Sequence, residues 1–383
     1  MLTKNEESEA LSLLYDILSI RTVNGEDDTA PLAQYLSLYL QNAGIRSSVE
    51  YIDEKNSNVT AWVQGETDDI IVLCGHMDTV PFGSLQEWHT PPQVPVLEGG
   101  RVYARGASDM KGGLAAMVFA LAQLGRRGVK PKSSLLFIGT ADEEKGGRGA
   151  AAAVKNGLPK ETKLLLIAEP TACDMGLAQK GCIWLKFLLE GKTAHAAYPT
   201  EGVSALDWAL KLAESVKQFA CRYEDALLGA STVTITSLHA GIANNMLPDR
   251  CEMVLDIRTV PGLAHKLLLT NLHQIIEGME AEQPKLAIHM EIINDRMPVS
   301  VPSENAILQE FLKLVYAATG KGPAPVGINF FTDASILVRE CPHIPVVLYG
   351  PGEQQTTHKP NEYMMLQSYF EAVGTYCRIC SEL

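Results

Sequence analysis

The sequence predicts a two-domain α/β protein, in which a small α+β domain interrupts a larger domain built on a mostly parallel sheet. Two observations support this class. Short, continuous apolar runs alternate with helical patterns at both ends of the chain, and the middle follows a β-α-β-β-α-β order. The length of 383 residues suits two domains, and a hydrophobic content of 46% provides enough apolar side chains for a sizeable core.

The larger domain is predicted from helices and apolar runs at both ends of the chain. Leu11, Leu14, Tyr15 and Leu18 follow the spacing of an amphipathic helix, and residues 114–124 repeat that spacing. The runs expected to form strands are residues 70–74, 135–138, 164–168 and 344–348. Continuous apolar runs of this length are typical of parallel strands covered on both faces. We therefore assign residues 1–178 and 293–383 to one α/β domain.

The middle of the chain predicts a different arrangement. Strands are expected at residues 182–189, 232–236, 252–258 and 286–293, with helices at 203–219 and around 268–276. This order is typical of a ferredoxin-like sheet with both helices on one face. The sequence thus predicts an inserted α+β domain over residues 179–292.

Charge and hydropathy exclude several classes of partner. The chain has 45 acidic and 32 basic residues, a formal net charge of -13, which argues against nucleic-acid binding through a broad basic face. The apolar runs are too short to span a membrane, and residues 1–10 are polar and acidic, unlike a signal peptide. We expect a soluble cytoplasmic protein, with its eight scattered cysteines reduced.

The first candidate site is His76 with Asp78, directly after the apolar run 70–74. Residues two apart in extended backbone point to the same side, so these two side chains can touch. A carboxylate behind a metal-binding imidazole orients the ring and makes it more basic. A polar strand end without function explains the pair equally well.

Four further motifs carry acidic or imidazole side chains. Asp109 precedes the helix predicted at 114–124, where it could equally be an N-cap. Glu143 and Glu144 follow another predicted strand, and adjacent side chains point different ways, so one could bind a metal while the other acts as a base. A solvated acidic loop is the alternative. Glu169 ends the run 164–168, and His358 follows the run 344–348 after a Gly-Pro-Gly turn.

The coincidence of these motifs favours a metal site. All five lie beyond the C-terminal ends of apolar strands predicted in one sheet, the edge where such folds bind ligands. Two histidines with three or four carboxylates suit a hard-to-borderline divalent ion and are numerous enough for two. The sequence therefore predicts a dinuclear site, without distinguishing the ligand from the base in the Glu143–Glu144 pair.

The whole chain then resembles the M20 metallopeptidases and deacylases, which include acetylornithine deacetylase, succinyl-diaminopimelate desuccinylase, aminoacylase and glutamate carboxypeptidase. The motifs that carry the resemblance are, in order, GHMDTVP, GASDMKGG, ADEEKGG, AEPT, GKTAHAAYP, GPG and THKPNEY. The resemblance implies a zinc-peptidase-like catalytic domain. It also implies that the inserted domain is a lid, which in this family usually forms a homodimer.

The resemblance assigns roles around the metals. It makes His76 and Glu169 ligands of one zinc, Glu144 and His358 ligands of the other, and Asp109 the bridge between them. Asp78 would support His76 from behind, and Glu143 would be the general base for a metal-activated water. Cobalt or manganese could replace zinc in either position.

The resemblance also assigns residues of the lid. His195 would stabilise the oxyanion, often from the partner subunit, although alone it reads as a surface histidine in a loop. Asn245 and Arg258 resemble residues that contact substrate. Arg258 could clamp a carboxylate, or instead form a salt bridge with Asp256 or Glu252.

The implied reaction is hydrolysis of the amide bond of a small N-acylated amino acid, and the GPG and HKPNEY motifs look closest to the acetylornithine deacetylase branch. A di- or tripeptidase or a carboxypeptidase is the mechanistically close alternative. A non-catalytic binding protein on the same fold should have lost a ligand or the base, and the sequence retains all of them.

Overall fold

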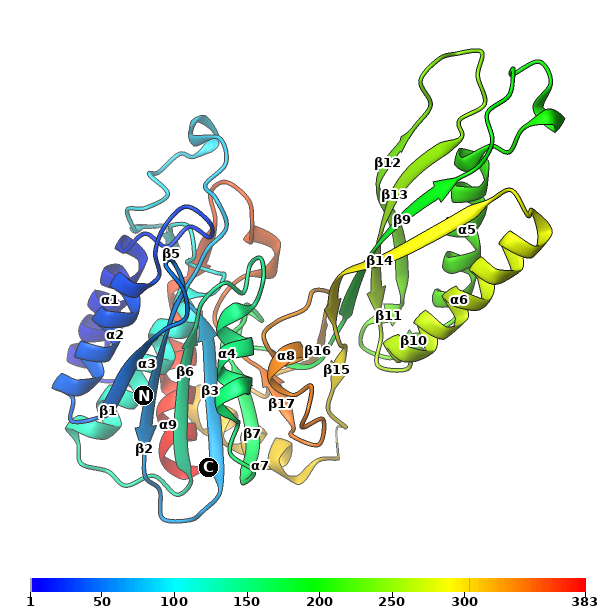
Figure 1. Ribbon diagram of the computed structural model, residues 1–383. Coiled ribbons are helices and arrows are strands. Elements are labelled where there is room, and N and C mark those ends of the chain that lie inside the picture. Colours follow the sequence, from blue (N-terminus) through cyan, green and yellow to red (C-terminus); the bar gives the residue numbers. More distant parts are fainter. Residues whose placement is uncertain (1, 303) are drawn as a thin grey trace. The chain divides into compact units, whose positions relative to one another are not determined.

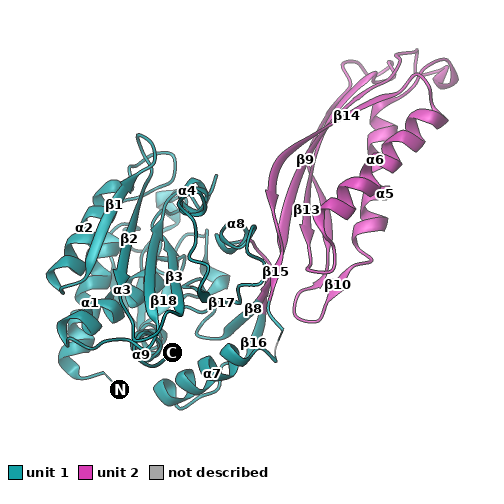
Figure 2. Ribbon diagram, turned by 60° about the horizontal axis from the view of Figure 1, so that its bottom comes forward, with its two compact units in different colours: residues 1–177, 301–326, 332–383 teal, residues 178–300, 327–331 magenta. Residues whose placement is uncertain are grey.

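The computed structural model describes residues 2–302 and 304–383, which form two compact units. Figure 2 colours the units separately. Unit 1 comprises the chain up to residue 177 together with residues 301–326 and 332–383, and unit 2 comprises residues 178–300 and 327–331. Unit 2 thus continues several residues past position 292, because the strand that closes its sheet ends at Arg296.

A nine-stranded sheet is the centre of unit 1 (Figure 1). Its strands are, in order across the sheet, β1 (Arg46–Tyr51), β2 (Ser57–Val63), β6 (Ser134–Thr140), β3 (Ile70–His76), β7 (Thr162–Ile167), β17 (Val346–Leu348), β8 (Met175–Gln179) and β15 (Val299–Ser300), with β16 (Pro325–Ile328) also paired to β8. The four central strands β6, β3, β7 and β17 run parallel, which confirms the predicted class. The outer pairings β1–β2, β2–β6, β17–β8 and β8–β15 are antiparallel.

Helices cover the sheet of unit 1. They are α1 (Lys4–Ser19), α2 (Ala30–Asn42), α3 (Lys111–Arg126), α4 (Arg148–Asn156), α7 (Ala306–Thr319), α8 (Ala334–Leu337) and α9 (Leu366–Glu382). Helix α3 contacts β3 and also packs against α1 and α9, while α4 contacts β6 and α8. Every residue of β3 is buried, as expected for a strand covered on both faces.

A second, small sheet in unit 1 joins distant parts of the chain. It contains β4 (Val96–Glu98), β5 (Arg101–Tyr103) and β18 (Tyr363–Met365), in the order β18-β5-β4. Antiparallel pairing places Tyr363 opposite Tyr103. The segment that carries His358 is thereby brought next to the segment that leads into Asp109.

Unit 2 contains a four-stranded antiparallel sheet with the order β12-β13-β9-β14. Its main elements follow the chain order β9 (Gly181–Glu190), α5 (Ala205–Ala220), β12 (Thr232–Ala240), β13 (Arg250–Thr259), α6 (His265–Glu282) and β14 (Ala287–Arg296), and β10 (Glu224–Asp225) pairs with β11 (Gly229–Ala230). Alternate residues of β9 and β13 are buried and share one core with α5 and α6. No helix in the described residues has the length and apolarity needed to cross a membrane.

Candidate metal centre

The acidic and imidazole motifs of unit 1 lie where the sequence places them, at the carboxyl ends of neighbouring strands. His76 is the last residue of β3, and Glu143 and Glu144 lie in the turn that follows β6. Glu169 comes two residues after β7, and His358 lies in the loop between β17 and β18. Because β6, β3 and β7 are parallel neighbours, these ends share one edge of the sheet.

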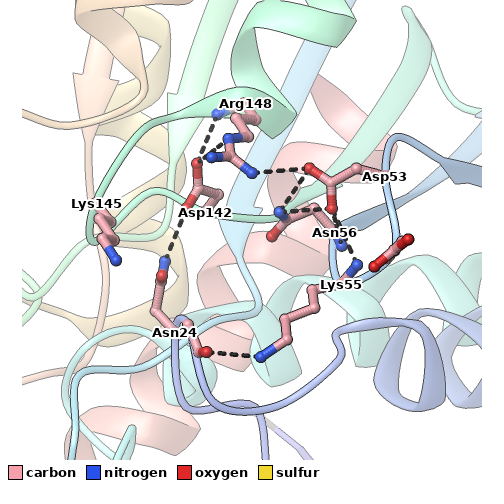
Figure 3. A pocket seen from close by; sticks show the side chains of 9 residues that line it. Asn24, Asp53, Lys55, Asn56, Asp142, Lys145 and Arg148 are labelled. Atoms are coloured by element: carbon pink, nitrogen blue, oxygen red, sulfur yellow. Dashed lines mark hydrogen bonds and ion pairs between the residues drawn. The ribbon is translucent and has the colours of Figure 1, made fainter.

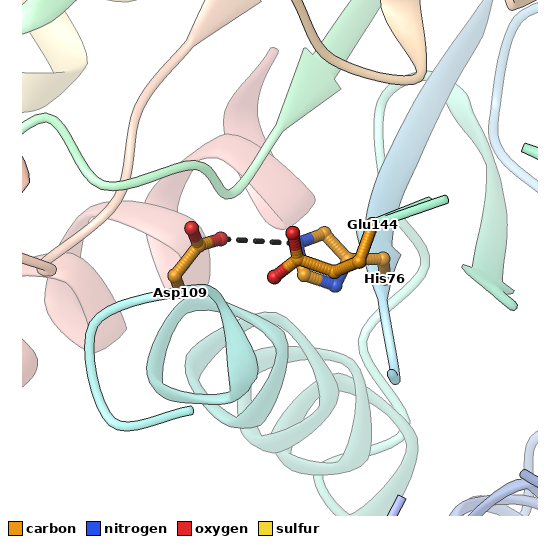
Figure 4. Close-up of side chains that lie close together, drawn as sticks. All are labelled: His76, Asp109 and Glu144. Carbon is orange, nitrogen blue, oxygen red and sulfur yellow. Dashed lines mark hydrogen bonds and ion pairs between the residues drawn. The ribbon is translucent and has the colours of Figure 1, made fainter. Parts of the chain in front are cut away.

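Asp109 contacts both histidines, one with each carboxylate oxygen. Its Oδ1 lies 3.1 Å from Nε2 of His76, and its Oδ2 lies 3.2 Å from Nε2 of His358. The same Nε2 of His358 lies 3.0 Å from Oε2 of Glu144. Figure 4 shows His76, Asp109 and Glu144, whose ligand atoms all lie within 4.8 Å of one another. The alternative in which Asp109 caps a helix is not observed, since α3 begins at Lys111 without a side-chain cap.

The donor set fits a divalent cation. Nδ1 of His76 lies 2.9 Å from the backbone carbonyl of Asp78, and a carbonyl only accepts, so this nitrogen is the donor. In the neutral ring, Nε2 then presents a lone pair to Asp109, an arrangement that requires a proton or a metal ion between them. Oε1 of Glu144 is buried without a hydrogen-bond partner among the described residues, which a metal ligand bond would satisfy.

The pKa values of the cluster show that burial disfavours the ionised form of its carboxylates. Burial raises the pKa of Glu143 and Glu169 well above the usual value, and it raises that of Glu144 to about 7. Hydrogen bonds to Asp109 and Glu144 raise the pKa of His358 to about 10. Two divalent cations would compensate these charges, as they do in carboxylate-rich metal sites.

Asp78 holds the acidic turn more closely than it holds His76. Its carboxylate accepts the backbone N–H groups of Glu143 at 3.2 Å and of Glu144 at 3.1 Å. The shortest distance from that carboxylate to Nδ1 of His76 is 3.8 Å. Nδ2 of Asn24 donates to Asp78 at 2.7 Å and to Asp142 at 3.2 Å. Asn24 and Asp142 line a polar hollow next to this turn (Figure 3).

Two glycines let the GPG turn lie against the segments that carry Glu169 and Asp109. A Cβ on Gly350 would lie 2.4 Å from the carbonyl oxygen of Ala168 and 2.5 Å from that of Glu169. A Cβ on Gly352 would lie 2.2 Å from the carbonyl oxygen of Ser108. Any other residue at either position would displace backbone next to Glu169 or Asp109.

The three sequence-predicted residues of the inserted domain lie in two places within unit 2. The segments of His195 and Asn245 are adjacent, because Ala196 N donates to the carbonyl of Asn245 and His195 forms a β-bridge with Met246. Both His195 and Asn245 are exposed. They lie beyond the end of the sheet where β13 begins at Arg250.

Arg258 lies near the opposite end of β13 and is already paired. Its Nε and Nη2 donate to the two carboxylate oxygens of Asp256, at 2.8 and 3.0 Å. Glu252, the other anticipated partner, instead pairs with Lys186 at 3.0 Å. The structure therefore separates Arg258 from His195 and Asn245.

Comparison with known proteins identifies the family. Residues 72–382 match the family model described as peptidase family M20/M25/M40. The chain belongs to this peptidase family. Membership makes the chain a metallohydrolase and agrees with the histidine and carboxylate cluster.

Individual relatives of this M20 protein are distant but cover nearly its whole length. A probable succinyl-diaminopimelate desuccinylase of Staphylococcus aureus is 25% identical, over 98% of this chain and 97% of the relative. A tripeptidase structure, also from Staphylococcus aureus, has a TM-score of 0.78 at 21% identity and covers 98% of this chain and 97% of the other. A dinuclear metal-binding M20 peptidase of Bacillus subtilis has a TM-score of 0.72 at 15% identity, covering 99% and 98%. The structural matches show the shared fold.

Several polar residues around the candidate site were not identified from the sequence. Asn24 links Asp78 to Asp142, and Arg105 and Glu362 form a buried ion pair beside Asp109. Glu362 lies in the THKPNEY motif, so the motif could be recognised in the sequence, but the pairing of Glu362 with Arg105 could not. Their contacts join segments far apart in the chain, and no local spacing signals them.

Proposed function

We propose that the chain is a dinuclear metal-dependent hydrolase that cleaves the amide bond of a small N-acylated amino acid. The observation that carries the proposal is the contact of each Asp109 oxygen with a different histidine. In the proposed site, Asp109 would contribute to holding both divalent ions, and His76 and Glu169 would hold one of them. Glu144 and His358, which contact each other, would hold the second ion. Zinc is the proposed metal, with cobalt or manganese as alternatives.

The proposed reaction uses Glu143 as general base. When bound, the divalent ions supply Lewis acidity and lower the pKa of a bound water towards neutrality. Glu143 accepts the proton of the attacking water and passes it to the departing amine. The Asp78 carboxylate accepts the backbone N–H groups of Glu143 and Glu144, and these contacts position both residues for their proposed roles.

The role of Glu143 is tested by separating turnover from metal binding. Glu143→Ala should abolish hydrolysis while the purified protein keeps the metal content of the parent chain. Loss of both metals from this variant would contradict the assignment of Glu143 as base. Metal analysis of the parent chain also tests the alternative of a non-catalytic binding protein, which predicts no bound metal.

His195 is proposed to stabilise the oxyanion. Its Nδ1 accepts the backbone N–H of Ala197 at 3.1 Å, so the ring proton lies on Nε2 and can be donated. One oxyanion donor of this kind is commonly worth about 3 kcal/mol in the transition state. Asn245, on the adjacent segment, is proposed to contact the substrate from the same side.

A homodimer would explain why the proposed substrate-contacting residues of the inserted domain lie apart. Arg250 begins β13 and Arg258 lies next to its other end. Eight residues at a strand rise of about 3.3 Å separate the two by about 26 Å. One small substrate cannot touch both ends of the same strand, so we propose that His195 and Asn245 act on the substrate of the partner subunit. The edge strand β12, with exposed Ile235, is the proposed dimer contact.

Complementation tests the arrangement between subunits. Chains with Glu143→Ala are expected to be inactive, and chains with His195→Ala are expected to lose activity by roughly 100-fold. Mixed dimers should recover activity, because one of the two sites then contains both an intact base and an intact partner histidine. Mixed dimers that form and stay inactive would refute the role of His195 in the partner's site.

The proposed substrate class is an N-acyl amino acid, with di- or tripeptides or a carboxypeptidase substrate as the alternative. The relative named a desuccinylase favours the first class, and the structural match to a tripeptidase favours the second. Arg258 would have to break its two hydrogen bonds to Asp256 before its guanidinium could bind a substrate carboxylate with two hydrogen bonds. A screen of N-acetyl and N-succinyl amino acids beside peptides, with added zinc or cobalt, distinguishes the classes. A cytoplasmic location belongs to the same proposal.

A further inference from the structure

The carboxylate of Glu362 is fully buried and uses both of its oxygens. Oε1 accepts the backbone N–H of Ser108 at 2.9 Å and that of Asp109 at 3.0 Å. Oε2 accepts from Nη1 of Arg105 at 2.6 Å. Two successive amides that point at one carboxylate form a small anion-binding concavity, and here that concavity fixes the backbone of Asp109 itself.

The same residue stands at the end of the segment that carries His358. His358 has a positive φ of 59°, a conformation that non-glycine residues adopt rarely and that neighbouring contacts must maintain. Those contacts are present on its C-terminal side. The Lys359 carbonyl accepts from Arg105 at 3.1 Å. The side chain of Asn361 accepts from His89 N at 2.8 Å and donates to the carbonyl of Glu87 at 2.9 Å.

Arg105 completes the connection. Besides Glu362 and the Lys359 carbonyl, it donates from Nη2 to the carbonyl of Pro81 at 3.0 Å, and its guanidinium lies 5.1 Å from the centre of the Trp88 ring. Its side chain is almost completely buried. Removal of one member of such a buried pair leaves the other charge without compensation.

We propose that Glu362, held by Arg105, is a positioning residue of the metal centre, which fixes the backbone of Asp109 and the segment of His358 relative to each other. This inference rests on the proposed metal-binding function. Glu362 contacts neither histidine nor a ligand carboxylate directly; it acts through the two amides and through the chain that leads back to His358. A residue that only stabilises the fold would raise thermal stability without affecting how tightly the metals bind.

The test compares Glu362→Gln with Leu13→Ala in the full-length chain. Glutamine keeps the size of the side chain, but its NH2 group must face either the amides of Ser108 and Asp109 or the guanidinium of Arg105, all of which are donors. Leu13 is buried on α1 in the same unit and outside the ligand segments, so its truncation controls for lost stability. Zinc affinity of the metal-free chains is measured by competition with a chromogenic chelator, alongside the increase in Tm on zinc addition.

We expect Glu362→Gln to weaken zinc binding by about 10- to 100-fold and to reduce the increase in Tm, as changes behind metal ligands commonly do. Leu13→Ala should lower Tm and leave zinc affinity unchanged. Equal zinc affinity in the parent and Glu362→Gln, or an equal loss in Leu13→Ala, would overturn the positioning role. If Glu362→Gln does not fold, Arg105→Lys is tested in its place. Weaker zinc binding by Arg105→Lys would support the positioning role, and zinc binding equal to that of the parent chain would overturn it.

The parent chain separates this inference from the function on which it rests. A parent chain that binds none of zinc, cobalt and manganese would overturn both the proposed metal centre and the positioning role. A parent chain that binds two ions, with variants that bind them as tightly, would overturn the positioning role alone.

Discussion

Asp78→Asn should reduce turnover while leaving the proposed metal ligands in place. The Asp78 carboxylate accepts three N–H groups, that of Glu143 on Oδ1 and those of Glu144 and Asn24 on Oδ2. In asparagine an NH2 group, which cannot accept a hydrogen bond, must replace one of the two carboxylate oxygens. Replacing Oδ1 removes one hydrogen bond, whereas replacing Oδ2 removes two, so the N–H of Glu143 is the group left unsatisfied.

The magnitude follows from that lost contact. Asp78 is 1% exposed, so water cannot replace the bond, and an unsatisfied buried donor costs about 1–3 kcal/mol. A shift of the Glu143 backbone by about 1 Å would lower kcat by about 100-fold, or about 2.7 kcal/mol in the transition state. The hydrogen bond from His76 goes to the backbone carbonyl of Asp78, which the substitution retains.

The assay measures kcat together with metal content per chain. We expect a lower kcat at parental metal content, because the proposed base Glu143 moves and the proposed ligand His76 does not. Asn24→Ala serves as a milder comparison, since it removes one donor to Asp78 and leaves the carboxylate itself. Loss of metal with an unchanged kcat per metal-loaded chain would refute the reasoning, because Asp78 would then act through His76.

Two further predictions concern packing and protons. Gly350→Ala places a methyl group 2.4 Å from the Ala168 carbonyl oxygen and should lower the free energy of unfolding by about 1–3 kcal/mol. Gly374→Ala, in open space on α9, is the control and should be neutral or stabilising in the same thermal unfolding experiment. Equal changes in Tm for the two variants would contradict the clash. Metal binding at Nε2 of His358 must displace a proton held with a pKa of about 10, so affinity should rise with pH from neutrality to about 10. Calorimetry in buffers of different ionisation enthalpy measures the released protons, and pH-independent affinity without proton release would exclude this competition.

The sequence was sufficient to predict the central strands because both of their faces are buried. Continuous apolar runs identified β3, β6 and β7, and their shared edge predicted that the acidic and imidazole motifs gather in one place, where His76 contacts Asp109. Strand β1, with its polar sequence RSSVEY at the edge of the sheet, carries no such signal. Antiparallel additions at both edges therefore became visible only in the structure.

The parts of the site that were not predicted depend on geometry beyond the strands. The expectation that the Asp78 side chain lies against His76 considered that pair alone. In the structure the Asp78 carboxylate lies 3.8 Å from Nδ1 of His76 and also accepts the N–H groups of Glu143 and Glu144, which belong to a turn far along the chain. The pair of Arg105 with Glu362 depends on the register between β5 and β18, which sequence spacing does not reveal.

The link between Glu362 and Ser108 spans 254 positions of the chain, and it has a consequence for biosynthesis. A nascent chain on the ribosome displays His76, Asp109 and Glu144 long before His358 and its anchor have been made. In the proposed site, these early residues meet their remaining ligand only when β18 pairs with β5. Hydrolytic competence would then be acquired late and in one step, after the catalytic unit has been synthesised almost to its last helix.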